Sequence, residues 1–249
     1  MSGRPTAADT VWFADSFATA DGRRAEYTGS KDLAATAPLP NARGAGGGYT
    51  YSAYACGRDF DGYVLLGAQG GAGLIAKFAM VQTTGTWRLA DVPKGKILRL
   101  EMRGVAAGKP QRGECNEGFG LSDSAATVHH GKEVHNIIWT FYRPGQEPGG
   151  VRPYVQWAGS PYSADTAAIG ARLSTNPYKP DDLAIEYDSG KGTIAFFHNR
   201  QTVYVFADPA GVAALAKVPL ALVFRTALDN VQTIEMAGWS LKIVDAEAK

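Results

Sequence analysis

The sequence has few cysteines and no long hydrophobic run. Cys56 and Cys115 are the only cysteines among 249 residues, too few for a disulfide framework. The first six residues do not resemble a secretion signal, so we expect a cytoplasmic protein as synthesised, or a released or particle-associated one. Both thiols are then expected to be reduced and mostly buried. A disulfide between them remains the alternative if the protein is exported by another route. No run of about 18 apolar residues occurs, which predicts no membrane insertion.

Net charge is also small. The chain has 25 Lys and Arg against 24 Asp and Glu, a net charge of +1. This balance gives no general attraction to phosphate backbones or anionic lipids, so we exclude nucleic acid as the expected partner. Carbohydrate or a protein surface remains as the expected partner, and a homo-oligomer is compatible with the sequence. The hydrophobic fraction of 45% is ordinary for a globular protein with its own core.

What the sequence has in abundance is glycine, at 30 residues, placed between short apolar runs. These runs are rich in aromatic and β-branched residues, which is typical of strands joined by turns. The expected strands are 11–17, 48–55, 62–66, 74–82, 87–90, 97–103, 119–122, 136–142, 152–157, 168–174, 183–187, 193–198, 202–206, 218–225 and 238–244.

One stretch, residues 208–217, has the pattern of a helix. Asp208 can cap its N-terminus, Pro209 suits the first helical position, and Pro219 follows the run of helix formers. Many strands with a single short helix exclude a doubly wound α/β fold, which needs a helix between successive parallel strands. We predict an all-β, two-sheet antiparallel sandwich or jelly roll that forms a single domain over 1–249.

Two segments support half-buried strands. In 98–103, leucine and methionine alternate with Arg99, Glu101 and Arg103, so the charged side chains share one face. Segment 179–204 has the pattern of three antiparallel strands, joined by a glycine-containing turn at 189–192 and a tight turn at Asn199 and Arg200. This segment predicts a β-meander.

The meander, with its acidic start and its asparagine turn, resembles the concanavalin A-like lectin/glucanase superfamily, including SPRY-type and phage-tail-like relatives. The opening residues 13–17 and the closing residues 231–244, with Trp239, resemble the paired terminal strands of that superfamily. The resemblance covers most of the chain and implies a fold. Because folds of this kind carry many functions, the resemblance by itself does not choose between binding and catalysis.

Catalytic motifs of the superfamily are incomplete here. The Glu-x-Asp-x-Glu pattern of laminarinase-type glucanases is not found. Arg99, Glu101 and Arg103 resemble the strand with which alginate-lyase-type members hold a uronate carboxylate, but the Gln-x-His and tyrosine motifs that accompany it are not recognisable. We therefore favour a solvated, cross-paired ion cluster for these three residues, and we lean towards a protein that is not an enzyme.

Metal sites are also weakly supported. His130 and His135 are the candidate ligands, together with His129, but their spacing fits no standard zinc pattern and a polar loop is favoured. Lectins of the legume type hold calcium through clustered Asp and Asn. A calcium site at Asp59 and Asp61, or at Asp181 and Asp182, is the remaining cofactor hypothesis, although such residues are ordinary in turns.

Aromatic residues are the best candidates for a binding site. A region rich in Gly, Pro and Ser carries four of them, and flat rings often bind the apolar face of a sugar; they are Tyr154, Trp157, Tyr162 and Tyr178. Trp157 is the first choice among them, although packing at the end of a strand is favoured over binding. The other four tryptophans are expected in the core.

Three functions follow as hypotheses. The leading one is a non-catalytic, lectin-like domain that recognises glycans or a partner protein through loops or a face of the sandwich. The second is a structural subunit of a viral or phage particle or of another assembly. The third is a polysaccharide lyase or hydrolase that uses the face of Arg99, Glu101 and Arg103.

Overall fold

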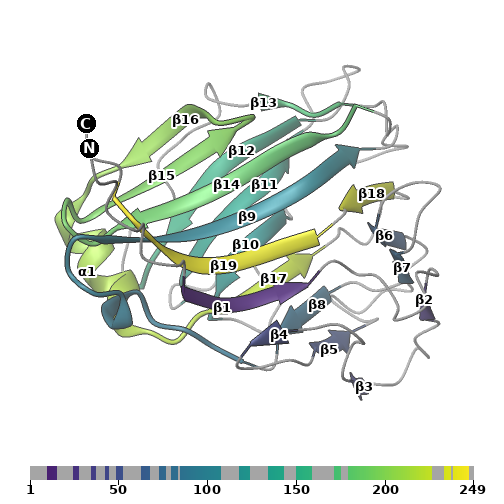
Figure 1. The fold of residues 1–249 in the computed structure, drawn as a ribbon, viewed down its shortest axis with the longest axis horizontal. Helices are drawn as coiled ribbons and strands as arrows, with labels where there is room; N and C mark the ends of the chain where they lie inside the picture. Colours follow the sequence, from purple (N-terminus) through teal and green to yellow (C-terminus); the bar gives the residue numbers. More distant parts are fainter. Residues whose placement is uncertain are drawn as a thin grey trace, which may run out of the picture.

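The computed structural model contains two β-sheets packed face to face, with one α-helix beside them (Figure 1). It describes residues 10–15, 25–27, 35–37, 43–44, 49–52, 63–67, 73–76, 80–83, 85–107, 118–123, 134–142, 150–158, 171–174, 179–225, 233–236 and 238–246. The two-sheet sandwich predicted from the sequence is therefore confirmed.

The first sheet has 11 strands, and β9 lies near its centre, paired with β14, β18 and β19. Its strands are β1 (Thr10–Asp15), β2 (Ala25–Tyr27), β4 (Arg43–Gly44), β6 (Tyr63–Gly67), β7 (Gly73–Ala76), β9 (Lys96–Ala107), β14 (Asp181–Asp188), β15 (Thr193–His198), β16 (Gln201–Phe206), β18 (Thr233–Met236) and β19 (Gly238–Asp245).

The second sheet has eight strands, in the order β13, β12, β11, β10, β17, β8, β5, β3. Their bounds are β3 (Ala35–Ala37), β5 (Tyr49–Ser52), β8 (Met80–Thr83), β10 (Gly118–Ser122), β11 (Asn136–Tyr142), β12 (Gly150–Gln156), β13 (Ala171–Arg172) and β17 (Ala221–Arg225).

Most strand pairs in both sheets are antiparallel. β1 pairs with β19, so the predicted pairing of the opening and closing strands is confirmed. Two pairs, β6 with β18 and β2 with β7, are parallel and were not expected from the sequence. Both belong to the 11-stranded sheet, at its far end from β16.

β9 and the meander form the regular part of the first sheet. Leu98, Leu100 and Met102 are buried between the sheets, so the alternation predicted for β9 is confirmed. The meander is also confirmed, because β14 pairs with β15 and β15 with β16. In its second turn Asn199 and Arg200 have φ of 49° and 68°, as a two-residue type I′ hairpin turn requires.

The second sheet contributes large side chains to the same core. Trp139 is fully buried, and its ring meets the ring of Phe196 from the first sheet edge to face, with centroids 5.2 Å apart. Two strands of this sheet approach unusually closely at Gly118, where a Cβ would lie 1.6 Å from the carbonyl oxygen of Trp139. Only glycine leaves room for this backbone contact.

Helix α1 (Pro209–Lys217) closes one end of the core, and the helix predicted for 208–217 is confirmed. Asp208 caps the helix by accepting a hydrogen bond from the backbone N–H of Ala210 at 3.0 Å. Val212 and Leu215 are buried against the sheets. Among the described residues, no helix is long and apolar enough to cross a membrane.

Two predicted strands differ from the structure. The single strand expected over 74–82 is two strands, β7 and β8, which belong to different sheets. A continuous apolar run does not mark the point where a chain leaves one sheet for the other. The strand expected over 87–90 is an isolated bridge at Trp87 followed by the 3-10 helix η1 (Leu89–Asp91). Pro93, which has no N–H for a strand ladder, follows closely.

Candidate functional site

The outer face of the eight-stranded sheet carries most of the neutral polar side chains of β11 and β12. Asn136 lies opposite Gln156, Ile138 opposite Tyr154, and Thr140 opposite Arg152. Alternate residues of the same strands, such as Ile137 and Val155, lie in the core. Since side chains alternate across a strand, these opposite pairs face away from the core.

A hydrogen-bonded row crosses three strands of this face. The Ser122 hydroxyl donates to Asn136 Oδ1 at 2.7 Å, and Asn136 Nδ2 donates to Gln156 Oε1 at 2.9 Å. The Tyr154 hydroxyl donates to the same Gln156 oxygen at 3.1 Å. Ser122 and Asn136 are fully buried, Gln156 is buried, and Tyr154 is half-buried. We call Ser122, Asn136, Gln156 and Tyr154 the polar row.

An apolar cluster lies beside the polar row on the same face. Ile138, Ala221 and Val223 are buried there, and the ring of Tyr154 packs against them. Further along, the Thr140 hydroxyl donates to the backbone oxygen of Arg152 at 3.3 Å. Tyr154 therefore combines an apolar ring held by packing with a hydroxyl held by hydrogen bonds.

The aromatic residues predicted to bind a ligand are not all brought together. Trp157 is half-buried and packs on the core, with its ring 5.4 Å from that of Phe206 and tilted by 54°. It is three residues beyond Tyr154, and its contacts are with the core rather than with the apolar cluster that holds Tyr154. Tyr162 and Tyr178 lie outside the described residues. Of the two that lie within the described residues, Tyr154 belongs to the polar row, whereas Trp157 packs on the core.

Arg99, Glu101 and Arg103 lie on the outer face of the other sheet. Arg99 Nε is 2.6 Å from Glu186 Oε1, and Lys242 Nζ is 3.1 Å from Glu101 Oε1. Arg99 is also within 3.9 Å of Glu101. Both the guanidinium and the carboxylate thus have partners of opposite charge within the sheet. Because the two outer faces point away from one another, this ion cluster and the polar row occupy opposite sides of the sandwich.

His135 joins the ends of three strands. Its Nδ1 is 2.7 Å from Asp123 Oδ2, and its backbone N–H donates to Asp123 Oδ1 at 2.8 Å. The N–H of Ala158 donates to its Nε2 at 3.4 Å. These contacts give the buried imidazole a structural role next to the start of β11. His129 and His130 lie outside the described residues.

Two of the candidate calcium ligands, Asp181 and Asp182, accept hydrogen bonds from other parts of the protein. Asp181 accepts from Asn199 Nδ2 at 2.7 Å, and Asp182 accepts from the N–H of Gly104 at 3.1 Å. Both carboxylates therefore help to hold the meander. Asp59 and Asp61 lie outside the described residues. Within the part of the chain that the structure describes, no three His, Cys, Asp or Glu residues gather as a metal site would require.

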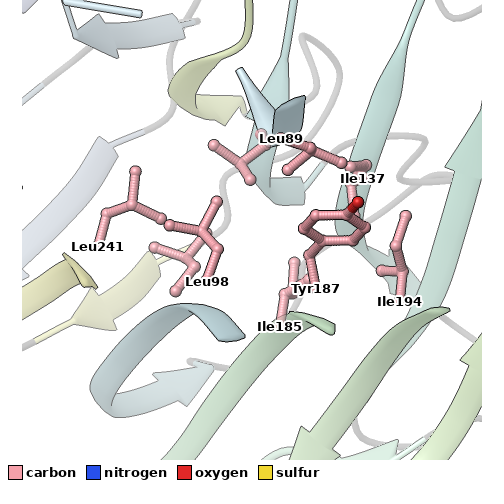
Figure 2. Close-up of a pocket in the computed structure, with 9 residues that line it drawn as sticks. Leu89, Leu98, Ile137, Ile185, Tyr187, Ile194 and Leu241 are labelled. Carbon is pink, nitrogen blue, oxygen red and sulfur yellow. The ribbon is translucent and has the colours of Figure 1, made fainter. Parts of the chain in front are cut away.

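A small apolar pocket with a volume of about 10 Å³ lies between the sheets near η1 (Figure 2). Tyr187 lines it together with leucine and isoleucine side chains from both sheets. Burial raises the pKa of Tyr187 above its ordinary value of 10.0, and the neighbouring Asp188 carboxylate raises it further. The pocket is part of the core and offers no polar group besides this phenol.

Asp188 has a pKa shifted in the opposite direction. Burial raises the pKa of this carboxyl, but hydrogen bonds from the Lys191 side chain and from the N–H groups of Lys191 and Gly190 outweigh that effect. The net pKa lies below the ordinary value of 3.8. The charged carboxylate therefore stabilises the turn between β14 and β15.

No protein-family model matches the sequence. No curated protein matches it either. Among solved structures, the crystal structure of an endo-1,3-beta-glucanase from Streptomyces sioyaensis covers 99% of this chain and 100% of its own, with a TM-score of 0.51 at 12% identity. The chain has the concanavalin A-like fold. The fold-level resemblance seen in the sequence is thereby confirmed.

Two further structures are similar over part of this concanavalin A-like fold. The carbohydrate recognition domain of Emp46p covers 65% of this chain and 76% of its own, with a TM-score of 0.45 at 9% identity. A laminarinase from Flavobacterium sp. UMI-01 covers 69% and 74%, with a TM-score of 0.39 at 16% identity.

Three members of the polar row, Ser122, Asn136 and Gln156, were missed as candidates in the sequence. One signal could have found two of them: Asn136 begins and Gln156 ends a strand made mostly of apolar or aromatic residues. The sequence of one strand does not show which residue of a neighbouring strand lies opposite such a position. In this concanavalin A-like fold they face each other across the sheet, which the pairing register decides.

Proposed function

We propose that this protein binds carbohydrate, and that Tyr154 and the polar row on the outer face of the eight-stranded sheet form the recognition site. The observation that carries the proposal is the position of Tyr154. Its ring is held on an apolar cluster and its hydroxyl is tied to Gln156. A flat ring and a fixed hydroxyl suit a sugar, which offers an apolar ring face and hydroxyl groups at its edge.

The chemistry of the other groups on this face supports the proposal. The described polar side chains there are hydroxyls, amides, a phenol and the guanidinium of Arg152. Groups of all these kinds can form hydrogen bonds with hydroxyls. The full-length similarity in fold to a glucanase adds a reason to begin with a β-1,3-glucan. On this proposal the protein is a lectin-like binding protein rather than an enzyme.

The test is a binding titration with soluble β-1,3-gluco-oligosaccharides, followed by a panel of uronate and mannose oligosaccharides. Saturable binding that Tyr154→Ala abolishes, with the variant still folded, supports the site. Tyr204→Phe is a matched control, because Tyr204 is a half-buried tyrosine of the other sheet. If no member of the panel binds, or if Tyr154→Ala binds like the wild type, the proposal is wrong.

The same samples separate the alternative functions. A large assembly whose mass does not change on dilution, with no glycan bound, would favour a structural subunit. Release of unsaturated sugar ends, lost in Arg99→Ala, would favour a lyase on the opposite face. The pairing of Arg99 with Glu186 weighs against the lyase, because a guanidinium that binds a protein carboxylate must release it to bind a uronate.

We further propose that residues 1–249 form one domain. β1 and β19 are neighbours in one sheet, although they lie at opposite ends of the sequence. A domain boundary between them would have to divide that sheet. A single transition in thermal unfolding, followed by both circular dichroism and tryptophan fluorescence, is expected; two separated transitions would contradict it.

A further inference from the structure

The first sheet ends at β16, the last strand of the meander. β16 pairs with β15 on one side, and on its other side it pairs with no strand among those that the structure describes (Figure 1). An edge strand of this kind presents backbone N–H and C=O groups that no neighbouring strand satisfies. The edge of β16 is therefore a place where a further strand can be added to the sheet.

β16 differs from the other described strands that end a sheet. Those strands have two or three residues each; they are β2, β3, β4 and β13. β16 has six residues, Gln201–Phe206, and none of them is charged, proline or glycine. Short length, charge and proline are common means by which an edge avoids pairing with another chain. β16 has none of these, and all its residues after Gln201 are β-branched or aromatic, the types that favour strands.

The accessible part of β16 is centred on Val205. Its side chain is 48% exposed, and it lies on the outer face of the sheet, because Tyr204 and Phe206 on either side of it pack on the core. The pairing with β15 shifts register by one residue near the hairpin turn, but residues 204–206 pair with 194–196 without a break. A bulge shields part of an edge, and the regular segment around Val205 lies beyond it.

A second copy of this chain fits this edge. Antiparallel pairing of two β16 strands around Val205 places the start of each strand beside the end of the other. Arg200 precedes β16, is exposed, and forms no ion pair with any described residue, and Asp208 follows β16. The pairing thus brings a cation of each copy close to a carboxylate of the other. The net charge of +1 opposes association of two copies only weakly.

We propose that two copies of this chain associate through their β16 strands, so that the first sheet continues from one copy into the other. The two Val205 side chains then lie opposite one another on the outer face and are removed from water. Each copy has one such edge, so association stops at a dimer with two-fold symmetry. The dimer does not depend on the proposed carbohydrate site, which lies on the other sheet.

The first test is sedimentation velocity of the full chain from about 1 µM to about 1 mM, which spans the Kd values of weak to moderate association. The wild type is expected to change from the monomer mass to the dimer mass, with no larger species. Val205→Lys places two like charges opposite one another at the centre of the pairing, so we expect Kd of the dimer to rise at least about tenfold.

Val11→Lys is the matched control for this variant. Val11 is a valine of the same sheet with a similar exposure of 51%, but its strand, β1, has β19 and β4 as neighbours on both sides. Its Kd should equal that of the wild type. Circular dichroism and thermal unfolding of both variants show that any loss of association is not a loss of fold.

The second test changes the charges at the two ends of β16. Arg200→Asp keeps a residue type that tolerates the positive φ of this turn and places two carboxylates close together, so Kd should rise about fivefold at low salt and less at high salt. Asp208→Asn keeps an oxygen that caps α1 and removes only the charge, so its effect on Kd should be smaller than that of Arg200→Asp.

Hydrogen exchange locates the contact. The amides of Gln201–Phe206 should exchange more slowly at concentrations where the dimer forms than where the monomer prevails, and those of β9, inside the sheet, should not change. A chain that stays monomeric over the whole range overturns the proposal. So does a dimer whose Kd is unaffected by Val205→Lys, or whose β16 amides gain no protection, because such a dimer uses another surface.

Discussion

The outer faces of the two sheets use polar side chains in different ways. On the 11-stranded sheet, Arg99, Glu101, Glu186 and Lys242 are charged, partly exposed and paired with one another. On the eight-stranded sheet, the polar row is neutral and mostly buried. Charged groups remain near water because their desolvation is costly, whereas amides and hydroxyls can be buried once their hydrogen bonds are made. The two faces therefore satisfy their polar groups differently, one through ion pairs close to water and the other through hydrogen bonds away from it.

The largest expected effect comes from the close approach of β10 and β11. In Gly118→Ala the new Cβ would meet the Trp139 carbonyl, a backbone atom that cannot rotate away, so we expect unfolding free energy to fall by about 3 kcal/mol or more. Gly192→Ala is the control. Its φ of +64° is strained for alanine but no atom lies within 4 Å of the new Cβ, so about 1 kcal/mol is expected. Urea unfolding measures both, and equal losses would contradict the close-contact explanation.

The next effect tests whether the polar row stabilises the sheet. Asn136→Leu removes the amide that joins Ser122 to Gln156 and leaves their buried polar atoms short of a partner. We expect a loss of about 2 kcal/mol of unfolding free energy. Thr140→Val, on the same face but with a single longer hydrogen bond, should cost less than about 1 kcal/mol. If Asn136→Leu leaves the unfolding free energy unchanged, the polar row does not stabilise the sheet.

A smaller effect concerns acid pH and the first sheet. The folded protein holds the pKa of Asp188 below its ordinary value, so its carboxylate stabilises the fold above about pH 4. That contribution is lost as the pH falls through the folded-state pKa. We expect Asp188→Asn to lower the unfolding free energy by about 1 kcal/mol at pH 7. At pH 2 the difference from the wild type should be smaller. A difference that stays constant between pH 7 and pH 2 would count against this role of the carboxylate.

The smallest effect is expected at the ion cluster. Arg99→Met removes partners from Glu186 and Glu101 but leaves both carboxylates partly exposed, so a loss of only about 0.5 kcal/mol is expected at low salt. In 0.5 M salt the loss should shrink further, since salt screens exposed charges. Thermal unfolding at two salt concentrations is the measurement. A loss larger than that of Asn136→Leu would reverse the contrast between the two faces.

Local patterns of the sequence were enough to predict several parts of the fold. The alternation along Leu98–Arg103, the turn at Asn199 and Arg200, and the capped helix after Asp208 all appear in the structure as expected. Each depends on interactions within a few residues, such as side-chain alternation or a cap. The pairing of the terminal strands was expected from resemblance, and their register came from the structure.

The candidate site depended on the tertiary structure. Trp157 and Tyr154 are near one another in the sequence, yet Trp157 packs on the core and Tyr154 belongs to the polar row. Ser122 and Gln156 are 34 positions apart, but register places both beside Asn136. The sequence by itself determined most of the longer strands, the turn at Asn199 and Arg200, and the helix, because these follow from nearby residues. Only tertiary structure decided which polar side chains meet, because strand order and register are set by packing of the whole core.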